Sequence, residues 1–313
     1  MAGRFIGVDV GGTKVSVAVL DGTRLSEPTL RPTVTSSSEE LLDQLEAVIR
    51  AEGPADAVGI GVPSVIDFAT GTARHSVNVP LQDVPLRQIL TERLQMPVFV
   101  DNDGTVAALA EAHDDDLRVV AQSLVLFTIG TGVGGGIILG GRVYRGATGA
   151  AAELGHQLIG AQLEDGAPPH VDTWPQPGTL ERLAAGRALD ALGQQRGYRD
   201  GPEVVAAAQG GDARALEAIR ILGERLGAGI ANAINTFDPD QVVIGGGVSA
   251  AGDLLLDPAR AVAARFVLPG VGTRTEIRLA RYGPQAGVRG AALLAGHEAL
   301  QGSPEARVRV GGS

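Results

Sequence analysis

The chain has 313 residues, more than one domain of ordinary size requires, so an organisation in two lobes is expected. Its formal net charge of −10 argues against a nucleic-acid groove or an anionic membrane surface as a partner. The absence of cysteine excludes disulfides, thiolate zinc sites and thiol nucleophiles. The N-terminus carries no signal peptide and no apolar run approaches the ~18 residues that span a bilayer, so a cytoplasmic protein is expected.

The apolar pattern predicts strands and helices in alternation, which is typical of an α/β protein. The expected elements in chain order are a strand hairpin over 4–20, a helix over 38–53, a strand over 57–63, a helix over 85–94, a strand over 96–100, a second hairpin over 124–144, a helix ending at 237, a strand over 241–245 and a closing helix over 290–300. The two hairpins share one plan, strand, glycine-rich turn and strand, which indicates an internal duplication. Residues 160–178 contain four prolines and are expected to form a long loop, and the tail after 302 is expected to fray.

The glycine-rich turns of the two hairpins are candidates for a ligand site. "GTGVGG" at 130–135 formally matches a dinucleotide fingerprint, but a β-branched segment follows where a helix is required. "GGTK" at 11–14 is not a P-loop, because no helix comes next. Either turn alone is explained by a tight hairpin, whereas two of them favour a nucleoside triphosphate clamp, because exposed backbone N–H groups bind anions. Asp9 is the candidate ligand for Mg²⁺, directly or through water, and Lys14 would offset phosphate charge.

Asp101, Asn102 and Asp103 form a polar cluster at the end of a predicted buried strand, where a carboxylate removed from water is costly. Because Asp and Asn are both common helix N-caps, the triplet by itself is typical of a cap. The alternative is catalytic. An ionised carboxylate can orient a hydroxyl group and receive its proton during phosphoryl transfer.

Over almost its full length the chain resembles the ROK family of sugar kinases, most closely the bacterial glucokinase branch. The matching stretches are "DVGGTK" (9–14), "VDNDGTVAALAE" (100–111), "TIGTGVGGGIILGGRVYRGATGAAAELGH" (128–156), "ERLAAGRAL" (181–189), "FDPDQVVIGGGVS" (237–249) and "AGVRGAALLA" (286–295). The resemblance implies an actin-like ATPase fold, ribonuclease H-like, with two lobes and a cleft between them. The implied lobes are 1–115, joined by a C-terminal helix at about 285–302, and 116–284, with 303–313 as a tail. ROK repressors carry an added N-terminal helix-turn-helix, and because this chain opens on the first hairpin, the kinase form is expected.

The resemblance also implies a role for each motif. Asp103 is implied as the general base. The implied sugar contacts are Ser64, Asn78, Asn102, Asp103, Glu153, His156 and Glu181. The implied contacts to ATP and Mg²⁺ are Asp9, Gly11, Gly12, Thr13, Lys14, Thr131 and Gly132, with Gly245, Gly246 and Gly247 on the adenosine side.

Several positions depart from the family pattern near the sugar. Most members hold a structural zinc through the equivalent of His156 and three cysteines, and this chain has no cysteine. His170 and Asp172 are spaced for no closed tetrahedral site, so zinc is predicted to be absent. Ser64 stands where the family has glycine, and residues 104–105 replace the usual alanine and asparagine. A sugar pocket of different shape is therefore expected.

The sequence thus predicts ATP- and Mg²⁺-dependent phosphorylation of the 6-hydroxyl of a hexose, with glucose as the first choice. An N-acetylmannosamine, mannose or fructose kinase is the nearest alternative, because the altered loop would decide between these sugars. A sugar-binding regulator without turnover is a second alternative, although a sensor needs neither Asp9, Lys14 nor Asp103. A dinucleotide oxidoreductase is a third. Polyphosphate in place of ATP stays open, and a homodimer is expected by analogy.

Overall fold

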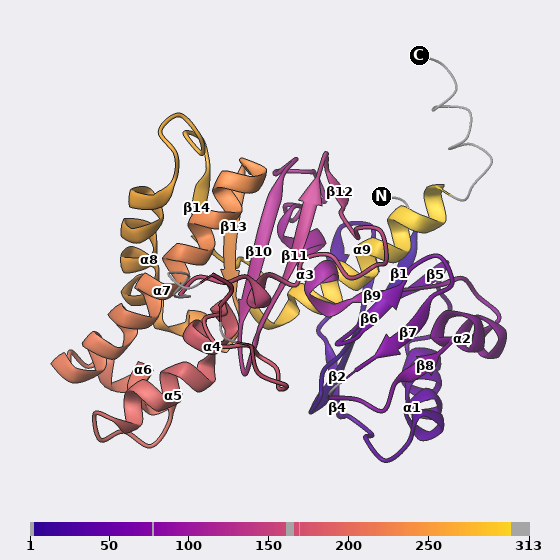
Figure 1. Cartoon of the computed structure of the whole chain (residues 1–313). Coiled ribbons are helices and arrows are strands. Elements are labelled where there is room, and N and C mark those ends of the chain that lie inside the picture. The colour runs from indigo at the N-terminus through magenta and orange to yellow at the C-terminus, as the bar shows by residue number, and fades with distance from the viewer. Residues whose placement is uncertain (1–2, 77, 161–165, 169, 302–313) are drawn as a thin grey trace. The chain divides into compact units, whose positions relative to one another are not determined.

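A computed structural model describes residues 3–76, 78–160, 166–168 and 170–301, with the side chain of residue 301 excepted (Figure 1). The chain divides into two compact units, each built from segments that are separate in sequence. The first unit comprises Met1–Val120, Gly141–Ala151 and Pro284–Ser313, and the second comprises Ala121–Gly140 and Ala152–Gly283. Segment 141–151, which the sequence placed in the second lobe, is thus part of the first unit. The tail that was predicted to fray, 303–313, lies outside the described residues.

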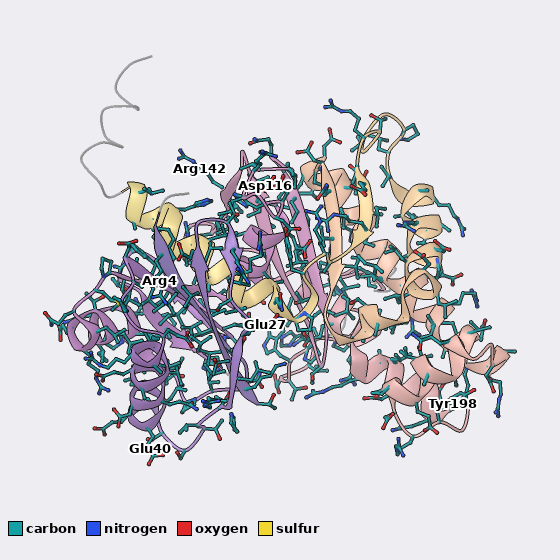
Figure 2. All side chains as sticks on the ribbon, turned by 180° about the vertical axis from the view of Figure 1, so that it is seen from behind. Arg4, Glu27, Glu40, Asp116, Arg142 and Tyr198 are labelled. Atoms are coloured by element: carbon teal, nitrogen blue, oxygen red, sulfur yellow. The ribbon has the colours of Figure 1, made fainter. Side chains whose placement is uncertain are left out.

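The first unit contains a mixed sheet, a small three-stranded sheet and four α-helices among its described residues. Its elements are β1 (Arg4–Val10), β2 (Lys14–Asp21), β3 (Arg24–Leu25), β4 (Thr29–Pro32), α1 (Ser38–Ala51), β5 (Ala57–Val62), β6 (Val65–Asp67), β7 (Thr72–His75), β8 (Gln82–Val84), α2 (Leu86–Leu94), β9 (Val98–Asn102), α3 (Asp103–Glu111), β12 (Arg142–Val143) and α9 (Ala286–Gln301). The predicted first hairpin is confirmed, because β1 and β2 pair antiparallel from Arg4 with Asp21 to Val10 with Val15. Figure 2 shows charged side chains such as Glu40 and Asp116 on the outside of this unit.

The second unit repeats the strand order of the first. Its elements are β10 (Leu124–Ile129), β11 (Val133–Leu139), η1 (Leu154–His156), α4 (Leu180–Ala184), α5 (Gly186–Gln194), α6 (Gly201–Gln209), α7 (Ala213–Phe237), β13 (Gln241–Gly245), η2 (Gly247–Ala251), α8 (Asp253–Phe266) and β14 (Glu276–Leu279), with η3 (Gly283–Gln285) at the junction of the units. In the first sheet the order is β2-β1-β5-β9, and in the second it is β11-β10-β13-β14. In both sheets the hairpin is antiparallel and the two following strands are parallel to its first strand. The shared plan seen in the sequence therefore extends to sheet topology.

Each unit has its own hydrophobic core. In the first, residues of β1, β2, β5 and β9 pack with α1 and α2, and Ile6, Leu41 and Leu90 are fully buried. In the second, residues of β10 and β13 pack with α7 and α8, and Phe127 is fully buried. No helix of the described residues combines the length and apolar character that crossing a membrane requires.

Helix α9 lies directly against the first sheet at two glycines. Gly7 of β1 and Gly59 of β5 are register partners. A Cβ atom at Gly7 would lie 2.0 Å from the carbonyl oxygen of Val288, and one at Gly59 would lie 1.8 Å from that of Ala291. Side chains at these positions would therefore push α9 off the sheet. The helix begins at Ala286, close to the start at about 285 that the resemblance implied and four residues before the apolar pattern that begins at Gly290.

We expect Gly59→Ala to destabilise the first unit by about 2 kcal/mol or more, because the added methyl group has no space against the backbone of α9. The measurement is the thermal unfolding midpoint by circular dichroism. Gly210→Ala is the control, since Gly210 is exposed at the end of α6 with an ordinary φ of −78°. Equal midpoints for both variants would contradict the close approach of α9.

Candidate functional site

The parallel strands of the first unit bring three acidic residues to one edge of the sheet. Asp9 near the end of β1 is in register with Gly61 of β5, which is in register with Asp101 of β9. Asp103 follows as the first residue of α3. A Cβ atom at Gly61 would lie 3.5 Å from Cα of Asp103 and 3.9 Å from Oδ1 of Asp9. The space above Gly61 is thus bordered by both carboxylate residues that the sequence assigned to catalysis and metal binding.

The helix cap at the start of α3 belongs to Asn102. Its Oδ1 accepts hydrogen bonds from the backbone N–H groups of Gly104 and Thr105, and its Nδ2 donates to the carbonyl oxygen of Ser64. The carboxylate of Asp103 accepts the N–H of Gly104 at 2.8 Å, and no cation among the described residues pairs with it. Asp103 is therefore not needed as the cap, which was the alternative explanation of the cluster.

Asp9 lies against the first turn of α9, because a Cβ atom at Gly287 would be 2.5 Å from its carboxylate carbon. The pKa of Asp9 is raised to about 7, mainly by burial and also by the charge of Asp103, against the opposing effect of Lys14. Burial also raises the pKa of Asp103, against the effect of the Gly104 N–H. The two carboxyl groups therefore repel one another when both are ionised, and a cation between them would relieve this repulsion.

Asp101 has a different role from its neighbours. Its side chain is only 2% exposed, and its Oδ2 accepts a hydrogen bond of 2.7 Å from Nε of Arg145. Arg145 also contacts Glu298 of α9 at 3.3 Å and lies over the ring of Phe68 at 3.4 Å. The other oxygen of Asp101 accepts the N–H of Asn102. This network holds the end of β9, from which Asp103 follows.

The first glycine turn is held by local hydrogen bonds. The N–H of Gly11 donates to the carbonyl oxygen of Lys14, and the hydroxyl of Thr33 donates to that of Gly11. A Cβ atom at Gly12 would lie 3.1 Å from Cβ of Asn78, so the predicted sugar loop adjoins the turn. Thr13 and Lys14 are exposed.

Ser64 is 3% exposed, and its hydroxyl donates to the carbonyl oxygen of His75 at 2.7 Å. It therefore holds the end of β7, and its contact with a sugar stays a prediction.

In the second unit, Glu181 holds the second glycine turn. It lies in the first turn of α4, which Thr179 caps. Its Oε2 accepts the N–H of Val133 at 2.8 Å, and a Cβ atom at Gly132 would lie 2.5 Å from the same oxygen. Because of this bond Glu181 also shapes the turn, whereas the sequence assigned it only to the sugar.

Glu153 and His156 lie on one short turn, as their spacing predicted. Oε2 of Glu153 is 3.8 Å from Nε2 of His156, and η1 begins immediately after Glu153. The Nδ1 atom of His156 is buried and has no hydrogen-bond partner among the described residues. The ring of Trp174 meets the imidazole edge-on, with 5.1 Å between the ring centroids.

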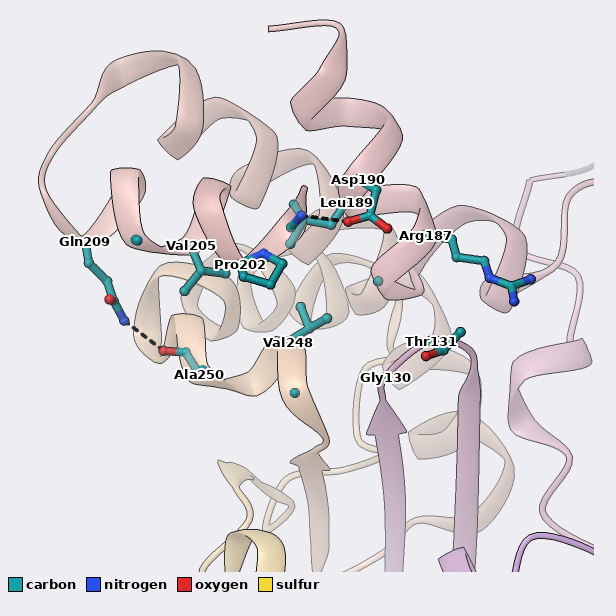
Figure 3. Close-up of a pocket in the computed structure, with 14 residues that line it drawn as sticks. Gly130, Thr131, Arg187, Leu189, Asp190, Pro202, Val205, Gln209, Val248 and Ala250 are labelled. Carbon is teal, nitrogen blue, oxygen red and sulfur yellow. Dashed lines mark hydrogen bonds between the residues drawn. The ribbon is translucent and has the colours of Figure 1, made fainter. Parts of the chain in front are cut away.

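A cavity of about 620 Å³ opens beside the second glycine turn (Figure 3). Pro202 and Val248 face one another across it, and Gln209 donates a hydrogen bond to Ala250 at one end. Gly130, Thr131 and Gly247 line the cavity. Its volume lies within the usual range for small-molecule pockets.

Two of the three predicted adenosine-side glycines do not line this cavity. Gly246 has a φ of +84°, and a Cβ atom there would lie 2.4 Å from the carbonyl oxygen of Ile129. Its conformation and the close approach to β10 thus both require glycine.

The residues present fit Mg²⁺ but not zinc. Asp9 and Asp103 offer carboxylate oxygens, which Mg²⁺ prefers, and this ion usually takes only one or two carboxylates beside water and phosphate oxygens. A structural zinc needs a closed set of four ligands, whereas the chain has no cysteine and the described residues hold no group of three His, Asp or Glu placed for a metal. The absence of zinc stays a prediction.

Comparison with known proteins identifies the family. The ROK family profile matches residues 5–298. The chain belongs to the ROK family. It is 34% identical to a glucokinase of Halalkalibacterium halodurans, over 93% of this chain and 94% of that protein. It is also 34% identical to an N-acetyl-D-glucosamine kinase of Salmonella heidelberg, over 93% of this chain and 98% of that protein.

The ROK fold is confirmed by solved structures. A ROK glucokinase from Streptomyces griseus, in complex with glucose and AMPPNP, has a TM-score of 0.77 and 32% identity, covering 94% of this chain and 99% of that chain. The actin-like ATPase fold predicted from the sequence is therefore correct. The roles of individual site residues are not tested by these comparisons and stay predictions.

Two contacts of predicted site residues and their neighbours were not predicted from the sequence. Arg145 is the partner of Asp101, although the alternation "VFVD" already placed Asp101 on a buried side, where an acid requires a cation. Trp174 contacts His156 from within the proline-rich loop. No short-range spacing signals either pair, because 44 and 18 residues separate the partners.

We expect Asp9→Asn to stabilise the ligand-free protein at alkaline pH. The folded-state pKa of about 7 lies above the reference value of 3.8, so ionised Asp9 destabilises the fold. The gain in free energy of unfolding from Asp9→Asn should be absent below pH about 4 and increase up to pH about 7. Above that pH it should stay constant, at no more than about 4 kcal/mol. Urea unfolding from pH 4 to pH 8.5 measures it, with exposed Asp116→Asn as control. A gain independent of pH would contradict this electrostatic origin.

We expect Arg145→Met to destabilise the protein by about 3–5 kcal/mol, because it leaves buried Asp101 without its cation. The double variant with Asp101→Asn should recover a large part of this loss, since no buried charge remains. A double-mutant cycle by urea unfolding measures the coupling. Additive losses would show that the pair is not coupled.

Proposed function

We propose that this ROK protein transfers the γ-phosphoryl group of ATP to the 6-hydroxyl of a hexose, with glucose as the first candidate. The observation that carries the proposal is the division of roles at the end of β9. Asp101 is neutralised by Arg145 and Asn102 caps α3, which leaves Asp103 as a carboxylate without a cation or a capping duty. Structural acids are normally paired, so an unpaired one at the carboxyl edge of a parallel sheet is a candidate for chemistry.

Asp103 is assigned as the general base. It would accept a hydrogen bond from the 6-hydroxyl, hold that oxygen in line with the γ-phosphorus, and take the proton as the new P–O bond forms and the bond to ADP breaks. Because its pKa is raised by burial, it is a stronger proton acceptor than an exposed aspartate. The rate should fall as the pH is lowered through this raised pKa, since protonated Asp103 cannot serve.

Lys14, the first glycine turn and Asp9 are assigned to binding the phosphates and Mg²⁺. Lys14 would pair with phosphate oxygens. The backbone N–H groups of Gly12 and Thr13 would bind phosphate oxygens as well, because they belong to a glycine-rich turn. Asp9 would hold Mg²⁺, which when bound neutralises charge on the phosphates. The raised pKa of Asp9 means that ion binding competes with a proton near neutral pH.

The second unit supports a nucleotide as the donor. The 620 Å³ cavity joins an apolar wall, formed by Pro202, Val205 and Val248, to the glycine turn at Gly130 and Thr131. A base can lie against the wall while its phosphates reach the turn. Arg187 lines the cavity and forms no hydrogen bond or ion pair with another described residue, so it is available to a phosphate. The AMPPNP complex of the Streptomyces griseus relative is consistent with this donor.

The sugar is assigned to the residues that the ROK motifs imply, Asn78, Asn102, Glu153, His156 and Glu181. Carboxylates accept from vicinal hydroxyls, while imidazole and amide groups also donate. An N-acetylhexosamine is the alternative substrate, because the N-acetyl-D-glucosamine kinase relative is as similar to this chain as the glucokinase relative. A cytoplasmic location and a homodimer stay predictions.

We expect Mg²⁺-dependent ADP release with glucose, and a fall of kcat by about 100-fold or more in Asp103→Asn, because the base is lost while the shape is kept. The assay compares glucose, mannose, fructose, N-acetylglucosamine and N-acetylmannosamine, with inorganic polyphosphate as a second donor. Exposed Asp116→Asn should retain full activity.

Turnover only on an N-acetylated sugar would keep the mechanism and change the substrate. Sugar binding by thermal shift without turnover on any hexose would instead identify a regulator. Full activity of Asp103→Asn would remove the assignment of the base.

A further inference from the structure

We propose that the indole of Trp174 is a platform on which the hexose ring lies, beside the imidazole of His156. The platform is a substrate contact outside the residues that the ROK motifs assign. It rests on the proposed function, because His156 and Glu153 face a sugar only if that function holds.

Trp174 is held in an exposed position. Its relative exposure is 68%, higher than that of the other large hydrophobic side chains among the described residues. Burial therefore does not determine where this side chain lies. An exposed indole is a large apolar surface with a polar N–H, which is typical of binding surfaces.

The loop around Trp174 is fixed by the amide of Gln176 instead. Its Oε1 accepts the N–H of Val171 at 2.9 Å, and its Nε2 donates to the carbonyl oxygens of Val171 at 2.6 Å and Thr173 at 3.2 Å. Gln176 is 9% exposed, so these bonds are largely removed from water. The loop thus presents Trp174 on a rigid support rather than on a free chain.

A second set of bonds ties this loop to α4. The hydroxyl of Thr179 donates to the carbonyl oxygen of Gln176 at 2.7 Å, and the same hydroxyl oxygen caps α4. The N–H of Ile159 donates to Gly178 at 2.9 Å. The loop is therefore connected to both His156, through the preceding chain, and Glu181, in the first turn of α4.

Trp174 and Glu153 both lie beside the imidazole of His156. The two rings meet at an angle of 83° with 5.1 Å between centroids, and Glu153 approaches the imidazole from its Nε2 side at 3.8 Å. An apolar surface, an imidazole and a carboxylate thus lie close together in one part of the second unit. A sugar has the matching pattern, with C–H groups on its ring face and hydroxyls at its rim.

The chemistry favours a pyranose with equatorial hydroxyl groups. Such a ring exposes several C–H groups on a face that is free of oxygen, and their slight positive charge suits the negative face of an indole. Glucose and N-acetylglucosamine both have this character, whereas the axial hydroxyl of mannose interrupts one face. Trp174 therefore favours the gluco series among the hexoses considered above.

Trp174 is the only tryptophan of the chain, so its fluorescence reports this position alone. The first experiment titrates the full chain with glucose in the absence of nucleotide, with mannitol at equal concentration as control. We expect a saturable change of emission with glucose and none with mannitol. An emission that stays constant at sugar concentrations saturating turnover would overturn the platform.

The second experiment uses Trp174→Ala, Trp174→Phe and the matched control Phe266→Ala, in which another exposed aromatic side chain of the second unit is removed. We expect Trp174→Ala to raise the KM for glucose about five- to tenfold, with kcat and the KM for ATP nearly unchanged. Trp174→Phe should recover part of the loss, because a ring remains. Phe266→Ala should not alter the KM for glucose.

The outcomes separate this proposal from the kinase function. A saturable emission change without turnover on any hexose supports the platform and refutes the kinase. Turnover with an unchanged sugar KM in Trp174→Ala keeps the kinase and overturns the platform. A change of oligomeric state in Trp174→Ala with unchanged KM, measured by light scattering, likewise overturns it and identifies a subunit contact.

Discussion

The close approach of α9 to the first sheet is the constraint on which the candidate site of that unit depends. Gly7 and Gly59 leave no side chain between the strands and the helix, so backbone meets backbone. At this distance the first turn of α9 reaches Asp9 through Gly287, and Gly290 meets the carbonyl oxygen of Val106 on α3. One helix thus touches the sheet, Asp9 and the helix that carries Asp103. Burial of Asp9, and with it the raised pKa, is a direct result of this packing.

The three consecutive polar residues at the end of β9 are largely removed from water, and each has a different set of partners. Asp101 is neutralised by Arg145, and Asn102 satisfies the N–H groups at the start of α3. Only Asp103 keeps an oxygen that no cation or cap occupies. The two supporting neighbours make the position of the third precise, because each ties the backbone on one side of it.

Much of the fold could be predicted because its signals are local. The hairpins at 4–20 and 124–144 follow from alternation and glycine, and the start of α1 follows from Ser37, whose side chain accepts the N–H of Glu40. The motifs around Asp9 and Asp103 are also local, because each lies within a short stretch of sequence. The Asp101–Arg145 pair and the contact of Trp174 with His156 could not be predicted. Both are contacts between segments that are distant in sequence, and no local pattern signals them. The bond of Glu181 to the N–H of Val133 could not be predicted either, because it depends on where the second glycine turn lies.

The packing of α9 on the first sheet also affects the order in which the two units fold. This helix follows every other described element in the sequence, yet it covers β1 and β5, which are near the beginning. During translation, the face of the first sheet that contains Gly7 and Gly59 stays uncovered until α9, which begins at Ala286, has been synthesised. The sheet, α7 and α8 of the second unit are complete in sequence by residue 283, so that unit can fold before the first one closes. Maturation of the site at Asp9 is therefore expected to be a late event in folding, with a large cost in loop-closure entropy.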